Sequence, residues 1–190
     1  MAYYTEEELD KIGFKKLGKN VKISDKASLY DAHLIEIGEN SRIDDFCIIS
    51  GNVSIGKYCH ITPGCLIAGG APGVYINDFC TMAYGVKIFA QSDDYSGASL
   101  VNSLIPKRYK NEILEKVELE SHVIIGAGSV IMPGVVVAEG CSVGAMSLVN
   151  KSTLAWGVYY GIPVSRKKER SRKMLTLLDD FLKGVNNDSI

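Results

Sequence analysis

An aliphatic residue returns at every sixth position through most of this 190-residue chain. The series runs without a miss over residues 37–67, resumes over 76–88 after a three-residue insertion, and returns over 119–149 after a longer break. Two weaker repeats precede it. The seventeen positions are Ile23, Leu29, Ile37, Ile43, Ile49, Ile55, Ile61, Ile67, Ile76, Met82, Ile88, Leu119, Ile125, Ile131, Val137, Val143 and Val149.

A period of six is neither helical nor that of a simple hairpin, and it favours short strands joined by tight bends with one large side chain inside at each repeat. Three repeats make one coil, so seventeen predict about six coils of a triangular parallel β-solenoid. The Pro-Gly pairs at 63–64 and 133–134 supply residues suited to the bends. We therefore predict an all-β solenoid in which each coil covers the next.

Charge and hydropathy exclude several classes of protein. The chain has 21 Lys and Arg against 22 Asp and Glu, a formal net charge of −1, so no global field exists to hold nucleic acid or an anionic membrane. Its apolar runs are shorter than the roughly 18 to 20 residues of a membrane span, and its first residues do not read as a secretory signal. We expect a cytoplasmic protein without membrane insertion and with reduced cysteines.

The five cysteines all follow the repeat. Each stands four residues after an aliphatic position, where the other repeats have a small or β-branched residue, and none forms a CxxC pair. A compact apolar side chain suits a narrow interior, so packing is the expected role. They are Cys47, Cys59, Cys65, Cys80 and Cys141.

Three segments break the repeat and set the predicted boundaries. Residues 1–20 are expected to form an N-terminal capping helix, with an N-cap at Thr5 and a stop at Gly18. Within the solenoid of residues 21–165, residues 92–116 form an excursion loop long enough to favour a function. Residues 166–190 are predicted to be a basic and amphipathic C-terminal helix.

The repeat resembles the hexapeptide-repeat acyltransferases, whose units read [LIV]-[GAED]-x-x-[STAV]-x. The resemblance covers roughly residues 20–165 and is most specific at HVIIGAGSVIMPGVVVAEGCSVGAMSLVNKS with GIPVSRK, which are similar to the maltose, galactoside and xenobiotic acetyltransferase group. Details such as SDDYSG are similar to acetyltransferases of surface-polysaccharide (O-antigen) clusters, such as those that act on nucleotide-linked viosamine. The resemblance implies a left-handed β-helix.

The resemblance also implies a homotrimer that uses acetyl-CoA and no metal. Acetyl-CoA would lie in the groove between neighbouring solenoids, with its pantetheine arm along the backbone and small side chains of Ala127, Ser129, Ala145 and Met146. The family's Gly-x-Pro turn is matched at residues 161–163, which would place Pro163 near the adenine. The basic residues that could pair with the CoA phosphates are Arg166, Lys167, Lys168 and Arg170.

Acetyl transfer from a thioester requires a nucleophile that loses a proton. In the maltose and galactoside enzymes a histidine at the base of the loop accepts it, whereas this chain has Asp93, or Ser92, at that place. Counting three repeats per coil could bring Asp93 or Asp94 near His122, and a carboxylate would orient that imidazole. Two hypotheses stay open: His122 accepts the proton with help from Asp93, or Asp93 acts itself. With an amino acceptor, the acidic pair could instead orient the ammonium group.

The other two histidines define the competing functions. His33 is expected to point inward, and His60 is expected to face outward at a corner. A γ-type carbonic anhydrase on the same solenoid would need three histidines around a metal, which positions 33, 60 and 122 poorly support. A scaffold that has lost catalysis is the non-enzymatic alternative. The leading prediction is an acetyl-CoA-dependent acetyltransferase for an amino or hydroxyl group of a sugar, with a nucleotide-linked sugar as the expected acceptor; the identity of the sugar and the acyl preference are left open.

Overall fold

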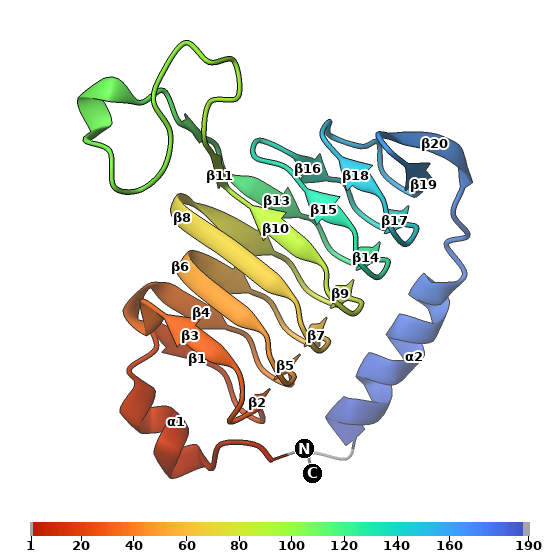
Figure 1. Cartoon of the computed structure of the whole chain (residues 1–190). Helices are drawn as coiled ribbons and strands as arrows, with labels where there is room; N and C mark the ends of the chain where they lie inside the picture. Colours follow the sequence, from red (N-terminus) through yellow and green to blue (C-terminus); the bar gives the residue numbers. More distant parts are fainter. Residues whose placement is uncertain (1, 188–190) are drawn as a thin grey trace.

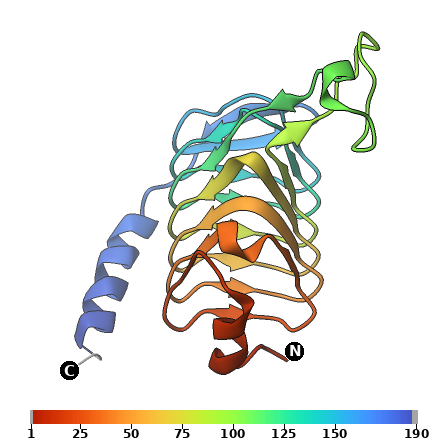
Figure 2. The same ribbon diagram turned by 90° about the vertical axis from the view of Figure 1, so that its left-hand side faces the viewer.

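The structure, a computed structural model, describes residues 2–187 and is a three-sided parallel β-solenoid with a helix at each end of the chain (Figure 1). Residues 188–190 of the predicted C-terminal helix lie outside the described residues. Successive coils pair as parallel strands, and the winding is consistent with the left-handed β-helix that the resemblance implies. The second view shows the coils stacked on one another, with the excursion loop projecting at one end (Figure 2).

Three sheet faces build the prism. Face 1 holds seven parallel strands and one antiparallel strand at its end: β2 (Lys22–Ile23), β5 (Arg42–Ile43), β7 (His60–Ile61), β9 (Thr81–Met82), β14 (Ile124–Ile125), β17 (Ser142–Val143), β19 (Gly157–Gly161) and antiparallel β20 (Val164–Glu169). Face 2 consists of β3 (Ser28–Tyr30), the first halves of β6 (Ile48–Ile55) and β8 (Leu66–Ile76), β10 (Lys87–Phe89), β15 (Val130–Ile131) and β18 (Leu148–Val149). Face 3 consists of β1 (Lys16–Leu17), β4 (Ile35–Ile37), the second halves of β6 and β8, β13 (Val117–Leu119) and β16 (Val136–Val137).

The three edges between the faces are tight bends, most of which contain a residue with positive φ. Edge A joins face 3 to face 1, edge B joins face 1 to face 2, and edge C joins face 2 to face 3. The bend residues of edge A include Tyr58, Phe79, His122, Gly140 and Trp156. Those of edge B are Phe46, Gly64, Gly85, Gly128 and Met146. In each of these two rows the amide of the bend residue donates to a carbonyl of the coil before it, so the bends stack.

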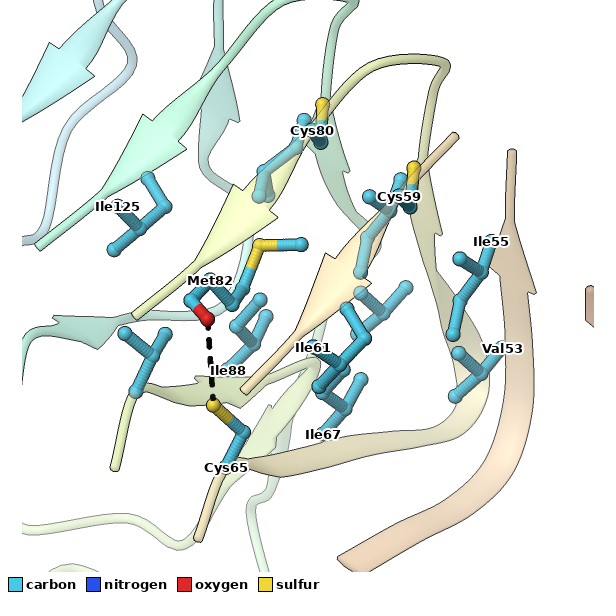
Figure 3. Packing of buried hydrophobic residues seen from close by; sticks show 14 of the residues in the cluster. Val53, Ile55, Cys59, Ile61, Cys65, Ile67, Cys80, Met82, Ile88 and Ile125 are labelled. Atoms are coloured by element: carbon cyan, nitrogen blue, oxygen red, sulfur yellow. Dashed lines mark hydrogen bonds between the residues drawn. The ribbon is translucent and has the colours of Figure 1, made fainter. Parts of the chain in front are cut away.

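The core confirms the repeat. Of the seventeen aliphatic positions, all except the half-buried Leu29 are buried, and side chains from successive coils stack on one another (Figure 3). The five cysteines are free and buried, and the Cys65 thiol points at the Met82 carbonyl of the next coil. The repeat count of about six coils misses part of a seventh, because Tyr159 of β19 takes the place of an aliphatic residue above Val143.

The N-terminal helix is shorter than predicted. Helix α1 (Glu6–Ile12) begins with the expected capping box between Thr5 and Glu8, but it ends at Gly13, which adopts φ 78°, and not at Gly18. Residues of β1 already pair with β4 before Gly18. The solenoid therefore begins at Lys16, earlier than the predicted boundary at residue 21.

The basic part of the C-terminal segment is a strand, and the prediction of a helix from residue 166 is wrong there. Strand β20 folds back on β19 through a turn at Ile162 and Pro163. The five residues of this edge strand after Val164 are all exposed, which suits a basic sequence. Helix α2 (Met174–Asn187) follows and runs back beside the coils toward the N-terminal end (Figure 2). Phe181 of α2 meets the Tyr58 ring of edge A edge-on.

The excursion loop leaves the prism at edge C. Its base is an antiparallel pair, β11 (Gln91–Ser92) with β12 (Ile113–Leu114), and its far part contains a short 3-10 helix, η2 (Lys107–Tyr109). A second 3-10 segment, η1 (Ala32–Leu34), replaces the bend of edge C near the N-terminal end. His33 lies in η1 and is exposed, so the expectation that it points inward is wrong.

Candidate active site

A cavity of about 550 Å³ lies where the excursion loop joins edge C. Its apolar wall includes Phe89, Leu114 and Met132, and its polar groups include Asp93 and the lysines at 107 and 110. We call it the loop pocket. The full lining consists of Ala71, Phe89, Gln91, Ser92, Asp93, Tyr95, Ser103, Lys107, Lys110, Glu112, Leu114 and Met132.

Charged groups are held at this pocket by the loop. The Lys110 side chain is only 7% exposed, and its ammonium lies 2.9 Å from a carboxylate oxygen of Glu112. Asp93 is half-buried and accepts a long hydrogen bond, 3.4 Å, from the Asn102 amide across the loop. An ionised carboxylate accepts up to four hydrogen bonds, so Asp93 retains capacity for a ligand that donates.

Asp94 has a different role from its neighbour. Its carboxylate accepts hydrogen bonds from the Ser96 amide and the Ser99 hydroxyl, and Ser99 in turn accepts one from the Asn111 amide on the other side of the loop. The bonds from Ser96, and then the bond from Ser99, lower the pKa of the Asp94 carboxyl. The structure thus places Asp94 as a brace inside the excursion loop, whereas Asp93 lines the pocket.

We expect the loop to loosen in acid because of Asp94. A carboxyl whose pKa is lowered by folding stabilises the folded loop above its unfolded pKa of about 3.9 and loses that contribution as pH falls through the lower folded value. Hydrogen exchange of loop peptides, corrected for intrinsic rates, should therefore accelerate below about pH 3.9. In Asp94→Asn the same acceleration should already be present at pH 7. The exposed Asp10→Asn is the matched control and should leave loop exchange unchanged; unaltered exchange in Asp94→Asn would contradict the bracing role.

His122 lies on edge A, and the expectation that Asp93 or Asp94 comes near it is wrong within this chain. Strand β13 crosses face 3 between the loop on edge C and His122, and three residues at about 3.3 Å each, with the flanking bends, separate them by more than about 10 Å. The prediction was wrong because the count of repeats gives the coil on which a residue lies but not the edge of the prism. A catalytic role for His122 stays an untested prediction, without the support of a neighbouring Asp93 or Asp94 carboxylate.

The surroundings of His122 are those of a packed ring. It is 9% exposed, stacks on Phe79 at 5.5 Å between ring centroids, and lies 6.5 Å from the Trp156 ring. Phe79 in turn stacks on Tyr58 at 5.0 Å. The four rings form a column along edge A, beside which helix α2 packs through its contact with Tyr58.

The residues predicted to line the pantetheine arm share one edge. Ala127 and Ala145 lie on edge B in successive coils, and the Met146 amide donates to the Ala127 carbonyl. Ala145 and Met146 are exposed, whereas Ser129 is fully buried and hydrogen-bonds the Gly144 carbonyl, so only its backbone could reach a ligand. The turn that contains Pro163 continues this row, because the Gly161 amide donates to the Ser147 hydroxyl.

The four basic residues predicted to bind the CoA phosphates have different surroundings in the structure. Arg166 pairs with Glu169 at 2.6 Å, the Lys167 ammonium lies 4.8 Å from the Tyr160 ring, and Lys168 is exposed. Arg170 donates to the carbonyls of His122, Gly140 and Cys141 at 2.7 to 3.2 Å, and burial lowers its pKa. Arg170 therefore anchors the segment before α2 to edge A, whereas the other three side chains are exposed on β20.

A polar cluster on face 1 was not recognised as a unit in the sequence. Asp44 is 2% exposed and holds Arg42 and His60, with Nε2 of His60 at 2.8 Å. His60 faces outward, as predicted, but it lies in strand β7 of face 1 and not at a corner. Arg42 and His60 lie side by side in adjacent coils because they are eighteen residues apart, which is the length of one coil. A search for polar residues at that spacing would have found the pair.

The three histidines lie apart, in η1, on face 1 and on edge A. Among residues 2–187 no group of three or more His, Cys, Asp or Glu side chains is placed to hold a metal ion. Across the same residues, no helix has the length and hydropathy needed to cross a bilayer.

The triangular β-solenoid, the row of small residues on edge B and the Gly-x-Pro turn are features that the resemblance to the hexapeptide-repeat acyltransferases implies. The family model "Bacterial transferase hexapeptide (six repeats)" matches residues 35–69 and 116–151. The dTDP-4-amino-4,6-dideoxy-D-glucose acyltransferase of Escherichia coli is 40% identical over 193 aligned positions that cover all of both chains. The chain belongs to the hexapeptide-repeat acyltransferases, and it is an acyltransferase.

Solved structures of one relative extend the comparison. AntD, an N-acyltransferase from Bacillus cereus, in complex with dTDP and 3-hydroxybutyryl-CoA, matches with a TM-score of 0.95 and 49% identity, over 97% of this chain and 98% of that one. A variant of AntD in complex with dTDP-4-amino-4,6-dideoxyglucose and coenzyme A matches with a TM-score of 0.94 and 49% identity, over 96% and 97%.

Proposed function

We propose that this enzyme transfers an acyl group, such as acetyl, from acyl-CoA to the amino group of a dTDP-linked 4-amino-4,6-dideoxy sugar. The observation that carries the proposal is the full-length similarity to an acyltransferase for that sugar. AntD, which is also similar over nearly the whole chain, binds both kinds of ligand. The proposal chooses nitrogen over oxygen as the acylated atom, which the sequence alone left open.

The charges of the loop pocket suit such an acceptor. An amino sugar at neutral pH carries an ammonium group, and its diphosphate carries negative charge. Asp93 supplies a carboxylate for the ammonium, and Lys107 lies in the same pocket lining as a cation for the diphosphate, beside Lys110, which is paired with Glu112. Asp93 is then a group that orients the amine, and edge B, with Ala127 and Ala145, is the groove for the pantetheine arm.

A homotrimer is part of the proposal, because pocket and groove lie on different edges of one chain. Face 2 supports self-association: its outward column reads Ile48, Leu66, Lys87, Val130 and Leu148 in consecutive coils. Four of these five outward residues are apolar, and apolar residues gathered on an outer sheet face favour an interface with another chain. Covering face 2 with another subunit would bring the edges that flank it, B and C, to the interface, so the groove of one subunit would meet the loop pocket of the next.

The cellular setting follows from the substrates. Acyl-CoA and nucleotide-linked sugars are soluble intermediates, so we propose a cytoplasmic enzyme that prepares an amino sugar for surface polysaccharide such as lipopolysaccharide. The alternatives from the sequence are weaker. A γ-type carbonic anhydrase needs three converging histidines, and a scaffold without catalysis does not account for a charged pocket beside a small-residue edge.

The test is a direct assay of CoA release. Purified protein is incubated with acetyl-CoA or 3-hydroxybutyryl-CoA and with dTDP-4-amino-4,6-dideoxyglucose, its 4-hydroxy analogue, or simple glycosides. We expect turnover only with the 4-amino sugar, and an amide in the product by mass spectrometry. Asp93→Asn should raise the KM of the sugar about tenfold or more without a matching change for acyl-CoA, as expected for a lost charge-assisted hydrogen bond. Turnover of the 4-hydroxy analogue alone would overturn the proposal.

A further inference from the structure

We propose that His60, held by Asp44 on face 1, is the proton acceptor for the amine in this reaction. The inference rests on the proposed function and adds a catalytic group to it. Neither the loop pocket nor the row along edge B contains a histidine, and His122 is enclosed by rings on edge A. His60 begins strand β7, four residues before the edge B bend residue Gly64. Its ring contacts Asp44, which lies two residues before the edge B bend residue Phe46.

The two carboxylate oxygens of Asp44 are used differently. Oδ1 accepts from Nε of Arg42 at 2.6 Å and from the Tyr3 hydroxyl at 3.4 Å, whereas Oδ2 lies 2.8 Å from Nε2 of His60. Arg42 is always charged, and the hydrogen bond to Asp44 raises its pKa further. A carboxylate clamped in this way fixes the orientation of the imidazole ring, as the carboxylate of a catalytic triad does.

This arrangement decides which nitrogen of His60 is basic. An ionised carboxylate only accepts, so Nε2 carries the hydrogen and the lone pair of the neutral ring is on Nδ1. The His60 side chain is 40% exposed although Asp44 is buried, so the ring can meet a ligand at the surface. Asp44 is the charged group that contacts the ring, and Arg42 and Tyr3 are charged or titratable groups that contact the other oxygen of Asp44.

The position of His60 fits a ligand that lies along edge B. Neighbouring strands are about 4.8 Å apart, so His60 lies about one coil from the bend at Tyr84 and Gly85 and about two coils from Ala127. Tyr84 is 65% exposed and close enough to Arg42 to interact with it electrostatically. A thioester at the end of a pantetheine arm running down from Ala145 would therefore approach the coil of His60.

The proposed step balances. Nδ1 of His60 takes one proton from the sugar ammonium, and the freed nitrogen lone pair attacks the thioester carbonyl carbon. The tetrahedral intermediate collapses with cleavage of the C–S bond, which releases CoA thiolate. The second proton on the nitrogen leaves to water as the amide forms, and the imidazolium gives its proton to the thiolate. The products are the amide, free CoA and neutral His60.

The test is the pH dependence of His60→Gln. With dTDP-4-amino-4,6-dideoxyglucose and acetyl-CoA, the variant should lose about a hundredfold in kcat at pH 7, as is usual for a lost general base. The deficit should shrink to about threefold or less at pH 9, because a sugar amine, like an α-amino group of pKa near 8, is then already neutral. The KM for acetyl-CoA should stay unchanged. His33→Gln, an exposed histidine outside the site, should match wild type throughout.

The outcomes separate this inference from the proposed function. Wild-type turnover of the amino sugar together with His60→Gln turnover equal to wild type at pH 7 would overturn the inference alone. A loss in His60→Gln that is the same at every pH would also overturn it, since a merely structural defect is not repaired by deprotonating the amine. Absence of turnover in the wild type with any amino sugar would overturn the proposed function itself.

Discussion

Ala71→Trp and Ala145→Trp are each expected to abolish acyl transfer while the protein keeps its fold. Ala71 is an exposed residue of the loop pocket, and Ala145 is an exposed residue of the edge B bend. An indole at either position fills space that the proposed ligands need. A loss of more than about 100-fold in kcat/KM corresponds to the few kcal/mol that a blocked site removes.

Mixing the two variants tests whether each site is built from two subunits. In a homotrimer with the groove of one subunit against the pocket of the next, an intact site requires an Ala145→Trp subunit to give the pocket and an Ala71→Trp subunit to give the groove. Random hybrids refolded from an equal mixture should therefore regain about one quarter of wild-type turnover, since each condition is met in half of the cases. The assay is CoA release, before and after joint refolding.

The control for steric damage is Ser54→Trp, on the outward side of face 3 between Glu36 and Tyr75, which should keep wild-type activity. Size-exclusion chromatography with light scattering reports whether each variant assembles. Hybrids that are no more active than their parents would mean that pocket and groove serve each other within one subunit. The trimeric site of the proposed function would then have to be given up.

His122→Ala is expected to destabilise the enzyme by roughly 3 kcal/mol, whereas His122→Phe is expected to leave both stability and turnover close to wild type. The alanine opens a gap in the ring column between Phe79 and Trp156, and the phenylalanine keeps the stack. Denaturant unfolding and initial rates of CoA release measure the two effects.

This pair of variants separates packing from proton transfer. A benzene ring cannot accept a proton, so a well-folded His122→Phe enzyme with turnover reduced a hundredfold or more would restore the sequence-based hypothesis. The surroundings of the ring predict the opposite, since Phe79 occupies the same bend one coil earlier without any polar group.

The fold could be predicted from the sequence because the residue types in each repeat indicate which of its side chains are buried. At every sixth position, as at Ile61, the side chain has to be large and apolar. Four residues later, as at Cys65, it has to be small, since both positions face the same narrow interior. The break at residues 92–116 was equally visible. The ends were less predictable: β20 is basic and exposed, and nothing in its composition distinguished an edge strand from the start of a helix.

The candidate site also has one part that the sequence predicts and another that it does not. Positions on edge B, such as Ala127 and Ala145, are at equivalent places in consecutive coils, so the repeat and the family resemblance together identified the row. The relation of His122 to Asp93 depended on which edge each occupied, and the repeat count placed them together when face 3 separates them. The different roles of Asp93 and Asp94 depended on the path of the loop, which has no repeat.

The sequence by itself determined the prism, its interior and the equivalence of positions six and eighteen residues apart. These properties recur in every coil, so the same pattern of residue types appears many times along the chain. Only the tertiary structure decided which side chains meet across coils and edges: the clamp of Asp44 on His60, the ring column at His122, and the pocket under the loop. Such contacts depend on the direction of each side chain and on the path of irregular segments, and neither leaves a period in the sequence.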